Sequence, residues 1–455
     1  MECFLLRHGT VLTMDAAFTL YEDGYVLFRG AQILAVGSCA ALDENTLPAD
    51  CQVLDCTGKL ILPGMVNTHC HAPMVVFRSL GDDVPDRLRR YMIPLENSIM
   101  DETVCAASSL YAMGEMLLGG TTTVCDNYAY TQVSARSAEK IGMRAVLGGP
   151  ERVMGSTEPD PAAEKRNLAY QKQFIADWKG HPLVHPMVAC HAPYSESEAQ
   201  LTACTRLAEE EGVLMTMHTA EMPYEAEACM QKYGVSSVKH LDELGVLRPG
   251  FLAAHAVLVD EDDMQLMARR GVSVSHNIGS NLKSAKGVAP VARMRQLGIP
   301  VGLGTDGAMS GNTLDVMTQL PLCAKLQKTS THDRSAFPAK EVLSMATLEG
   351  ARALGLADRI GSLEPGKLAD IILLETDSAN MCPIYDPYSV IVYSANPSNV
   401  ETVFVNGVKV VDRRRLLTVD FKAVRREMMQ HCDRIRAAAD AIDRGMEQVS
   451  GKLAY

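Results

Sequence analysis

Two histidines that lie two residues apart are the first chemically informative feature of the sequence. His69 and His71 follow an apolar run that ends at Val66. In a strand, residues two apart point to the same side, so both imidazoles face one way while Cys70 faces the other. Two imidazole nitrogens on one side are a geometry that a metal ion can use. Alone, however, a His-x-His pair is equally compatible with two polar loop residues.

Further polar residues follow later apolar runs at the same relative place. They are His191, His218, His255, His276 and Asp306. If these runs are parallel strands of a barrel, their carboxyl ends meet at one face, where the active sites of that fold lie. A single histidine is more often structural than functional, but a shared place at the strand ends predicts one common site.

Two of these positions have informative neighbours. Glu221 lies three residues after His218, near enough to serve the same site. An acid at the start of a helix is the alternative, because the helix dipole favours it there. Asp306 is flanked by glycines at 304 and 307, which let the backbone turn sharply and the carboxylate point inward, although aspartate is also common in ordinary turns.

The segments that must position these residues are continuous apolar runs without alternation, as expected of parallel strands covered on both sides. Strands are predicted at Leu60–Val66, Thr121–Cys125, Arg144–Leu147, Leu183–Cys190, Val213–Met217, Phe251–Ala254, Val272–Ser275 and Pro300–Leu303. Helices are predicted between them, for example at Glu196–Glu211, Asp260–Arg270 and Val288–Leu297. Eight strand–helix units favour an α/β fold with a (β/α)8 TIM-type barrel, although a doubly wound sheet has the same alternation.

The two ends of the chain carry shorter, alternating strands. Asn406-Gly407 lies between two apolar runs, which predicts a hairpin. We expect one small composite β-sandwich built from residues 1–60 and 363–420, with the barrel of residues 61–362 inserted between them. Residues 421–455 should form a C-terminal helical tail on the surface or in an oligomer contact.

Composition restricts the class of protein. The formal net charge of -12, without a compensating basic tract, argues against a nucleic-acid partner. No apolar run reaches membrane-spanning length, and the first residues do not resemble a signal peptide. The 13 cysteines are scattered and mostly lie in apolar runs, as reduced core residues do. We therefore expect a cytoplasmic protein with neither a membrane nor a nucleic-acid partner.

Several motifs together resemble the amidohydrolase superfamily, and within it the 5′-methylthioadenosine/S-adenosylhomocysteine deaminases and the related chlorotriazine hydrolases. They are Asn67-Thr68-His69-Cys70-His71, His191-Ala192-Pro193-Tyr194-Ser195, His218-Thr219-Ala220-Glu221, Ser275-His276-Asn277 with Ser280-Asn281-Leu282-Lys283, and Gly304-Thr305-Asp306-Gly307. The likeness runs nearly from end to end. It includes the stretch from Gly361 to Asp370, which resembles the family's return into its β-sandwich.

The resemblance implies one divalent metal ion per chain, zinc or iron, bound by His69, His71, His218 and Asp306. Such an ion lowers the pKa of a water molecule from about 15.7 towards about 7. Asp306 would also take the proton of that water, His255 would orient it, and Glu221 would protonate the heterocycle before ammonia leaves. The implied activity is deamination of an adenine-type nucleoside such as 5′-methylthioadenosine, S-adenosylhomocysteine or adenosine.

The resemblance also suggests substrate contacts. It matches Glu96 to an acid that binds ribose hydroxyls, although a solvated helix carboxylate is an equal alternative, and His191 to a histidine that contacts substrate. Arg152 and Arg166 lie where the family has substrate-binding arginines. The family's tryptophans before Glu96 are missing, since the only tryptophan is Trp178. The alternative is therefore another heterocycle, such as guanine or another oxopurine, a pterin, cytosine or an s-triazine, with an amino or chloro leaving group.

Particular residues argue against two other classes of protein. A dinuclear relative needs a metal-bridging lysine at the end of the fourth strand, which here reads Ala189-Cys190-His191. A scaffolding barrel without catalysis predicts missing ligands, yet every expected ligand and acid is present. We therefore expect a hydrolase with one metal ion that acts on the carbon–nitrogen bonds of cyclic amidines and forms a homodimer or homotetramer.

Overall fold

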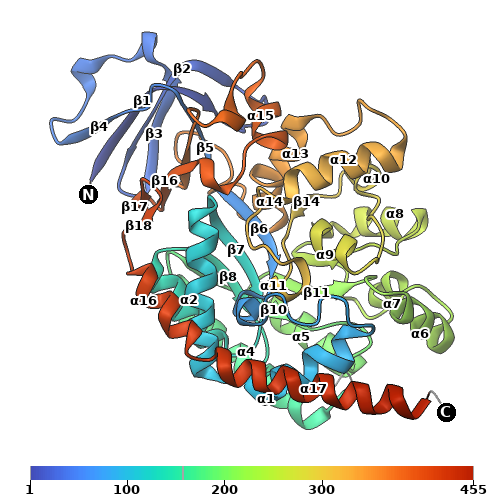
Figure 1. Ribbon diagram of the computed structural model, residues 1–455. Helices are drawn as coiled ribbons and strands as arrows, with labels where there is room; N and C mark the ends of the chain where they lie inside the picture. Colours follow the sequence, from blue (N-terminus) through green and yellow to red (C-terminus); the bar gives the residue numbers. More distant parts are fainter. Residues whose placement is uncertain (1, 156–157, 454–455) are drawn as a thin grey trace.

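The two ends of the chain meet in one sheet (Figure 1). The computed structural model describes residues 2–155 and 158–453. The sheet has nine strands in the order β18-β17-β16-β15-β5-β1-β2-β3, with β4 beside β1. These strands are β1 (Cys3–Leu12), β2 (Leu20–Arg29), β3 (Gln32–Ser38), β4 (Cys51–Asp55), β5 (Lys59–Pro63), β15 (Ile371–Glu375), β16 (Val400–Val405), β17 (Val408–Asp412) and β18 (Arg415–Leu416).

Aromatic side chains from both ends form the centre of this sheet's core. Phe4, Phe28 and Phe404 pack on one another with ring centroids 5.2–5.3 Å apart. All three are buried in a hydrophobic cluster that is separate from the main core. Because each ring removes a large apolar area from water, this cluster holds the two chain ends together. Strands from both ends of the chain therefore lie in one sheet, while the expected β-sandwich stays a prediction.

Asn406 and Gly407 form the predicted hairpin turn between β16 and β17. Both have positive φ, 52° and 76°. Two consecutive left-handed residues match a type I′ turn, whose twist suits antiparallel strands. A side chain at Gly407 would also collide with the carbonyl oxygen of Gly30, so this position requires glycine.

The middle of the chain forms two parallel sheets, in the orders β6-β7-β8-β9 and β10-β11-β12-β13-β14. Nearly all residues of these strands are buried, which explains why the sequence shows continuous apolar runs rather than alternation. The strands are β6 (Met65–Cys70), β7 (Thr121–Asn127), β8 (Arg144–Gly148), β9 (Val184–Pro186), β10 (Val188–Ala189), β11 (Met215–Thr219), β12 (Phe251–His255), β13 (Ser273–His276) and β14 (Val301–Leu303).

Two of the predicted single strands are each two strands, so those predictions are wrong. The run Leu60–Val66 contains the end of β5 and the start of β6, and the chain changes sheets at Gly64. A side chain at Gly64 would collide with Thr122, so glycine permits this close passage. The run Leu183–Cys190 divides into β9, which pairs with β8, and β10, which pairs with β11.

Most other predicted bounds agree with the structure to within two residues. The strand predicted from Val213 begins at Met215 instead, because the Val213 N–H closes the end of the preceding helix on the Ala208 carbonyl. The helix predicted from Val288 begins at Val291, directly after Pro290. Both differences lie at element ends, where capping contacts decide the boundary.

Hydrogen bonds connect the two parallel sheets. On one side, the N–H of Met187, which lies between β9 and β10, donates to the Leu147 carbonyl of β8. On the other side, the N–H groups of Thr305 and Asp306 donate to the carbonyl of His69. The end of β14 therefore lies against the end of β6, and the residues that follow these two strands share one region.

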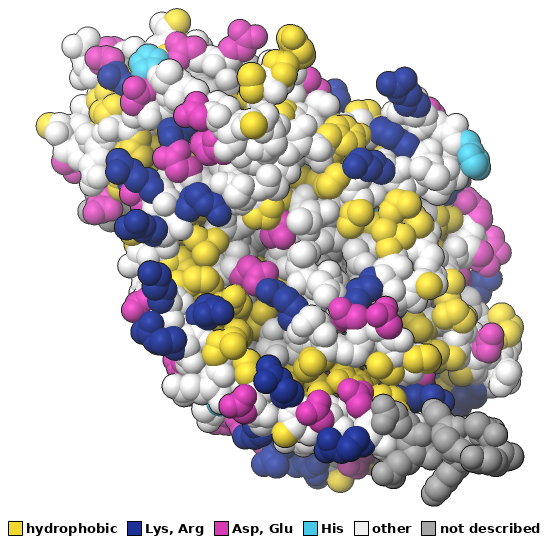
Figure 2. Space-filling model, viewed as in Figure 1, with side chains coloured by type: hydrophobic (Ala, Val, Ile, Leu, Met, Phe, Trp, Pro, Cys, Tyr) yellow, Lys and Arg dark blue, Asp and Glu magenta, His cyan; other side chains and the backbone are white. Residues whose placement is uncertain are grey.

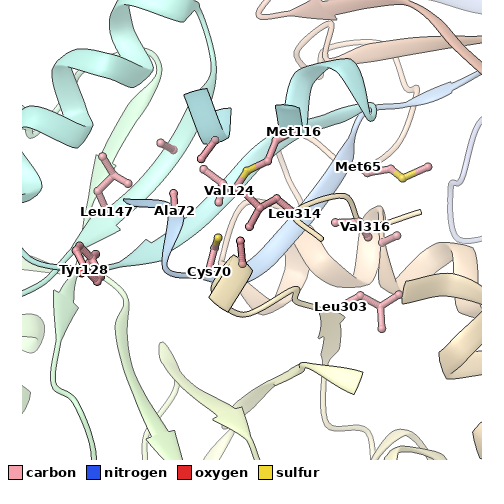
Figure 3. Close-up of a cluster of buried hydrophobic side chains, with 14 of the residues drawn as sticks. Met65, Cys70, Ala72, Met116, Val124, Tyr128, Leu147, Leu303, Leu314 and Val316 are labelled. Atoms are coloured by element: carbon pink, nitrogen blue, oxygen red, sulfur yellow. The ribbon is translucent and has the colours of Figure 1, made fainter. Parts of the chain in front are cut away.

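One face of β6 belongs to the main core. Cys70 is fully buried in a cluster that includes Met116, Val124 and Leu314 (Figure 3). Burial raises the pKa of its thiol well above the ordinary value. The rings of His69 and His71 lie together instead, with centroids 4.8 Å apart, as the strand alternation predicts.

Helices cover the parallel strands. Three of them correspond to predicted helices, α5 (Glu198–Glu211), α8 (Glu261–Arg270) and α10 (Val291–Gln296). The others are α1 (Ile93–Ile99), α2 (Glu102–Leu118), α3 (Thr131–Ile141), α4 (Pro161–Trp178), α6 (Pro223–Tyr233), α7 (Ser237–Glu243), α9 (Ile278–Lys283), α11 (Ala308–Gly311), α12 (Gln319–Thr331), α13 (Ala339–Met345), α14 (Leu348–Ala353), α15 (Pro387–Tyr393), α16 (Phe421–Met429) and α17 (Cys432–Leu453).

The last two helices lie on the outside of the molecule. Phe421 of α16 stacks on Tyr111 of α2 with ring centroids 5.1 Å apart, and α17 runs past α1 (Figure 1). Acidic and basic side chains are interspersed on the face shown in Figure 2. Within the described ranges, the helices are all too short or too polar to cross a membrane.

Candidate active site

Three imidazoles and one carboxylate converge where the parallel strands end. His69 and His71 come from β6 and the residue after it, His218 from β11, and Asp306 from the segment after β14. Their ligand atoms all lie within 4.8 Å of one another. His71 Nε2 lies 3.1 Å from His218 Nε2 and 3.3 Å from Asp306 Oδ1. The structure thus brings together the four residues that the resemblance implied as metal ligands.

The hydrogen bonds of two histidines leave their Nε2 lone pairs facing each other. His71 Nδ1 donates to the Asn127 carbonyl at 2.5 Å, and His218 Nδ1 donates to the His191 carbonyl at 2.7 Å. Because a carbonyl only accepts, each Nδ1 carries the hydrogen and both Nε2 atoms of the neutral rings are bare. Two such lone pairs 3.1 Å apart repel each other unless a cation lies between them. This donor set fits a divalent metal ion.

His69 fits the same ion. Its ring is fully buried, and neither ring nitrogen has a hydrogen-bond partner among the described residues. Burial, with the neighbouring imidazoles of His71 and His218, lowers the pKa of His69 well below its ordinary value, so the ring is neutral. A buried neutral nitrogen without a partner costs free energy that a bond to a metal ion would recover.

Asp306 is held with its carboxylate towards these imidazoles. Its backbone has a φ of 58°, which is left-handed and unusual for a residue other than glycine. The Gly307 N–H donates to Oδ1 at 2.8 Å, and Ser280 Oγ donates to Oδ2 at 2.6 Å. The strained backbone and these two hydrogen bonds fix the direction of the carboxylate.

His255 lies beside the cluster with one nitrogen directed into it. Its Nδ1 donates to Asn281 Oδ1 at 2.7 Å, so the hydrogen of the neutral ring is on Nδ1. The bare Nε2 lies 3.5 Å from Glu221 Oε1 and 4.0 Å from Asp306 Oδ2. It has no hydrogen-bond partner in the described part of the chain. His255 can therefore accept a hydrogen bond from a small molecule between the two acids.

Glu221 is fixed by contacts with its side chain and its backbone. Lys286 Nζ donates to Glu221 Oε1 at 2.5 Å. The N–H groups of Ala220 and Glu221 donate to the Glu225 carboxylate at 2.9 and 3.0 Å. Burial raises the pKa of Glu225 to about 7. Glu221 thus holds a defined place beside the cluster, where a carboxyl group can exchange protons with a bound molecule.

A cavity of about 530 Å³ opens onto the cluster. Its lining includes His71, His218, Glu221 and Asp306, so a molecule in the cavity reaches both the imidazoles and the acids. Tyr194 and Tyr224 also line it, with ring centroids 5.5 Å apart. The volume is in the range of pockets that bury small organic ligands.

Two residues predicted as substrate contacts line this cavity. Glu96 of α1 is buried and accepts a hydrogen bond from the Tyr128 hydroxyl at 2.5 Å, and burial raises its pKa. His191, after β10, forms a 2.7 Å hydrogen bond between Nδ1 and Ser195 Oγ. Burial and the neighbouring His218 lower the pKa of His191 to about 3.

The other predicted residues lie elsewhere. Arg152 and Arg166 are exposed, and neither belongs to the lining of the cavity. His276, at the end of β13, is fully buried near His255, and burial lowers its pKa to about 3. It does not line the cavity either.

Four contact residues of the site had no predicted role. Ser280 and Asn281 belong to a motif that the family resemblance included, so the sequence carried a signal for them. Tyr128 directly follows the last residue of β7, and the same strand-end rule that selected the histidines would have found it. Lys286 lies in a loop without periodicity, and nothing in the local sequence marks it.

Known proteins are similar to this chain over nearly its whole length. Residues 60–410 match the amidohydrolase family. The 5-methylthioadenosine/S-adenosylhomocysteine deaminase of Syntrophobacter fumaroxidans is 39% identical over 422 residues, which cover 92% of this chain and 95% of that protein. The 5′-deoxyadenosine deaminase of Methanothermobacter thermautotrophicus is 39% identical over 384 residues, covering 83% and 88%.

A solved structure agrees in fold. The adenosine deaminase from Xanthomonas campestris with bound zinc superimposes with a TM-score of 0.90 and 31% identity, covering 95% of this chain and 98% of that one. The family match spans most of the chain, and the relatives align with it over nearly their whole lengths. The chain therefore belongs to the amidohydrolase family.

Proposed function

We propose that this protein is a metal-dependent aminohydrolase that removes the exocyclic amino group of an adenine-type nucleoside and releases ammonia. The main supporting observation is that Glu221 and His255 lie beside four residues of the metal-binding type. One cavity opens onto this cluster. Similarity to deaminases of 5-methylthioadenosine, S-adenosylhomocysteine and 5′-deoxyadenosine supports this class of substrate. Candidate substrates are 5′-methylthioadenosine, S-adenosylhomocysteine, 5′-deoxyadenosine and adenosine.

One divalent ion per chain, zinc or iron, is proposed as the cofactor, held by His69, His71, His218 and Asp306. The opposed Nε2 lone pairs of His71 and His218 support this assignment. When bound, such an ion supplies Lewis acidity, which makes a water molecule a nucleophile at neutral pH. The zinc bound by the Xanthomonas campestris deaminase structure favours zinc.

The residues around the ligands orient and deprotonate the attacking water. His255 accepts a hydrogen bond from the water at Nε2, because Asn281 holds the hydrogen of the ring on Nδ1. Asp306 receives the proton of the water, and its second oxygen keeps the bond from Ser280. Both groups lie within reach of one small molecule, since His255 Nε2 and Asp306 Oδ2 are 4.0 Å apart.

Glu221 supplies the proton that the heterocycle needs. Carbon 6 of adenine resists attack until the adjacent ring nitrogen can accept electron density, and protonation of that nitrogen permits it. Glu221, in its protonated form, donates this proton as the carbon–oxygen bond forms. Asp306 then passes the proton that it took from the water to the amino group, which leaves as ammonia, and the proton of the added hydroxyl group returns to Glu221 as the carbonyl forms. Lys286 keeps the Glu221 carboxylate in place through its 2.5 Å contact.

Two further residues are proposed to hold the nucleoside. Glu96 accepts hydrogen bonds from ribose hydroxyls, while the Tyr128 hydroxyl fixes its direction. His191 contacts the substrate from the end of β10. The aromatic surface that the absent tryptophans would have supplied is provided by Tyr194 and Tyr224, which both line the cavity.

A proposal for the architecture accompanies this function. We propose that β6 to β14 close into a (β/α)8 barrel of residues 61–362, in which β9 and β10 are consecutive parts of one barrel strand. The hydrogen bonds from Thr305 and Asp306 to His69 support this closure. Residues 1–60 and 363–420 would form the β-sandwich around the Phe4, Phe28 and Phe404 cluster, and residues 421–455 the helical tail. A homodimer or homotetramer in the cytoplasm is proposed as the working state.

An assay of ammonia release distinguishes adenine nucleosides from the other candidate heterocycles as substrates. Zinc-loaded protein is assayed with adenosine, 5′-methylthioadenosine and 5′-deoxyadenosine, and in parallel with guanine, cytosine, a pterin and an aminotriazine. The adenine nucleosides should give the highest kcat/KM, and removal of the metal with a chelator should abolish turnover until zinc is returned. Faster turnover of guanine, cytosine, the pterin or the triazine would contradict the proposed substrate.

A further inference from the structure

Few positive charges line the cavity. Arg87, Lys283 and Lys286 are the cationic side chains of the lining, against seven carboxylates. No other lysine or arginine of residues 2–155 and 158–453 takes part in it. An anionic group on a bound molecule therefore has to find its partner among these three cations.

The two lysines are already paired with acids. Lys286 Nζ donates to Glu221 at 2.5 Å, and the lysine side chain is only 6% exposed. Lys283 Nζ donates to Asp82 at 2.6 Å. Withdrawing either ammonium to serve a ligand would leave a carboxylate of the cavity wall without its cation, which costs free energy.

Arg87 differs from the two lysines, because its hydrogen bonds go to neutral groups. Nη1 donates to the Met309 carbonyl at 2.7 Å, and Nη2 donates to Ser310 Oγ at 3.2 Å. Among the described residues it has no carboxylate partner at ion-pair distance. A guanidinium has five N–H hydrogens, so these two bonds leave three of them for other acceptors. In the described lining, Arg87 is the cation whose charge is not yet committed to an acid.

The protein holds Arg87 in place at the cavity. The residue is half-buried and directly precedes a turn of π-helix at Leu88–Met92, a form of helix that is rare and frequently lies at functional sites. The same segment continues to Glu96, the proposed ribose contact, and the two bonds of the guanidinium reach α11, which begins two residues after Asp306. Arg87 thus connects the segment that carries Glu96 to the segment that carries Asp306, and both segments line the cavity.

The acids around Arg87 restrict the kind of anion that suits it. Asp83 and Asp86 precede it on the same segment and also line the cavity. A group with two negative charges, such as a phosphate, is repelled by this excess of carboxylates. An amino-acid group carries one carboxylate and one ammonium, so it offers a partner to the guanidinium and to the acids at once.

The arginines that the family resemblance suggested as substrate contacts do not supply this charge. Arg152 and Arg166 are exposed and lie outside the lining. The lining next to Arg152 consists of Val153 and Met154, which are apolar. A carboxylate inside the cavity therefore meets Arg87 rather than either of them.

We propose that Arg87 binds the carboxylate of an amino-acid group at the 5′ position of the nucleoside, as in S-adenosylhomocysteine. This assignment rests on the proposed function. With the adenine at the metal site and the ribose at Glu96, the 5′ substituent is the part of the substrate that extends along the rest of the lining. A guanidinium can donate two parallel N–H bonds to a carboxylate, and the contacts with Met309 and Ser310 reduce the freedom that Arg87 loses on binding.

A matched pair of substrates isolates the carboxylate. The zinc-loaded enzyme is assayed with S-adenosylhomocysteine and with its primary carboxamide, which keeps the shape and the ammonium but loses the negative charge. The acid should have a kcat/KM at least about tenfold higher, because charge-assisted bidentate hydrogen bonds are about twice as strong as neutral ones. Equal values, or a preference for the carboxamide, would overturn the proposal.

Variants assign the effect to one residue. Arg87→Gln should bring the ratio of acid to carboxamide close to one, and Arg87→Lys should retain part of it, because an ammonium keeps the charge without the bidentate geometry. Arg90→Gln is the matched control, since it removes the same charge from an exposed residue of the same segment outside the lining and should leave the ratio unchanged. An unchanged ratio in Arg87→Gln, or a loss confined to Arg152→Gln, would contradict the assignment.

Binding of the deamination product separates recognition from turnover. The inosine analogue of S-adenosylhomocysteine has already lost its amino group, so calorimetry measures its Kd without a reaction. Arg87→Gln should weaken this binding at least about tenfold more than it weakens binding of the inosine analogue of 5′-methylthioadenosine, which has no carboxylate. Equal weakening of the two would refute a contact with the carboxylate.

Two further outcomes separate this inference from its alternatives. Faster deamination of adenosine 5′-monophosphate than of S-adenosylhomocysteine, lost in Arg87→Gln, would assign Arg87 to a phosphate and overturn the amino-acid group as its ligand. If no adenine nucleoside is deaminated, the proposed function itself fails. If adenine nucleosides are deaminated but the acid and the carboxamide are used equally, only the role of Arg87 fails.

Discussion

The buried ion pair between Arg144 and Asp370 offers a sharp test of how the parallel sheet is joined to the sheet from the chain ends. Arg144 begins β8, and Asp370 directly precedes β15. Arg144 Nε donates to Oδ2 at 2.8 Å and Nη2 donates to Oδ1 at 2.9 Å, with side-chain exposures of 1% and 2%. Asp370 also accepts the Asn406 N–H at 2.7 Å, so one carboxylate connects three segments.

The perturbation is Arg144→Met, which leaves the Asp370 carboxylate buried without its cation. Each of the two lost charge-assisted hydrogen bonds contributes about 1.5–3 kcal/mol. Removing one partner of a buried pair typically costs about 3–5 kcal/mol, which agrees with that sum. We expect a loss in this range in the free energy of unfolding. The double variant Arg144→Met/Asp370→Asn should recover part of it, because the amide is neutral and still accepts the Asn406 N–H.

Chemical denaturation followed by far-ultraviolet circular dichroism measures these differences. Arg293→Gln is the matched control, because it breaks the exposed pair with Glu261 and should hardly change the stability. Deaminase activity of folded Arg144→Met should stay close to that of the wild type, since neither partner lines the cavity. A loss below about 1 kcal/mol for Arg144→Met, as for a surface pair, would refute the reasoning.

Three further predictions concern the site. Glu221→Gln should keep its metal but lose at least about 100-fold in kcat, and comparable turnover would exclude Glu221 as the proton donor. Glu96→Ala should reduce kcat/KM for nucleosides more than for free bases, and equal losses would remove the ribose contact. Asn281→Leu should reduce kcat by about 10–100-fold with the metal retained, because His255 loses the acceptor that fixes its tautomer. Asn281→Asp keeps an acceptor and should lose less; equal losses in both variants would contradict this role.

The convergence of the site could be predicted from two simple rules. Alternation in a strand placed His69 and His71 on one side and Cys70 on the other. The meeting of parallel strands at their carboxyl ends selected His191, His218, His255, His276 and Asp306. Both rules depend only on backbone geometry. The structure brings His69, His71, His218, His255 and Asp306 together and places His191 in the lining of the cavity, whereas His276 lies outside that lining.

Other features depend on contacts that no local pattern encodes. The change of sheets at Gly64 follows from its close passage by Thr122, far along the chain, while the apolar run continues through it. Lys286 meets Glu221 across 65 residues from a loop without periodicity. Arg152 has the residue type and the place in the sequence for a substrate contact, but its side chain is exposed, and the neighbouring Val153 lines the cavity.

A crystal of the zinc-loaded protein, measured at the zinc absorption edge, tests the proposed metal centre most directly. We predict one anomalous peak per active site, about 2.0–2.2 Å from the Nε2 atoms of His69, His71 and His218 and from a carboxylate oxygen of Asp306. Two peaks of equal height at this place, or a peak bound by other residues while these four side chains lie apart, would contradict it.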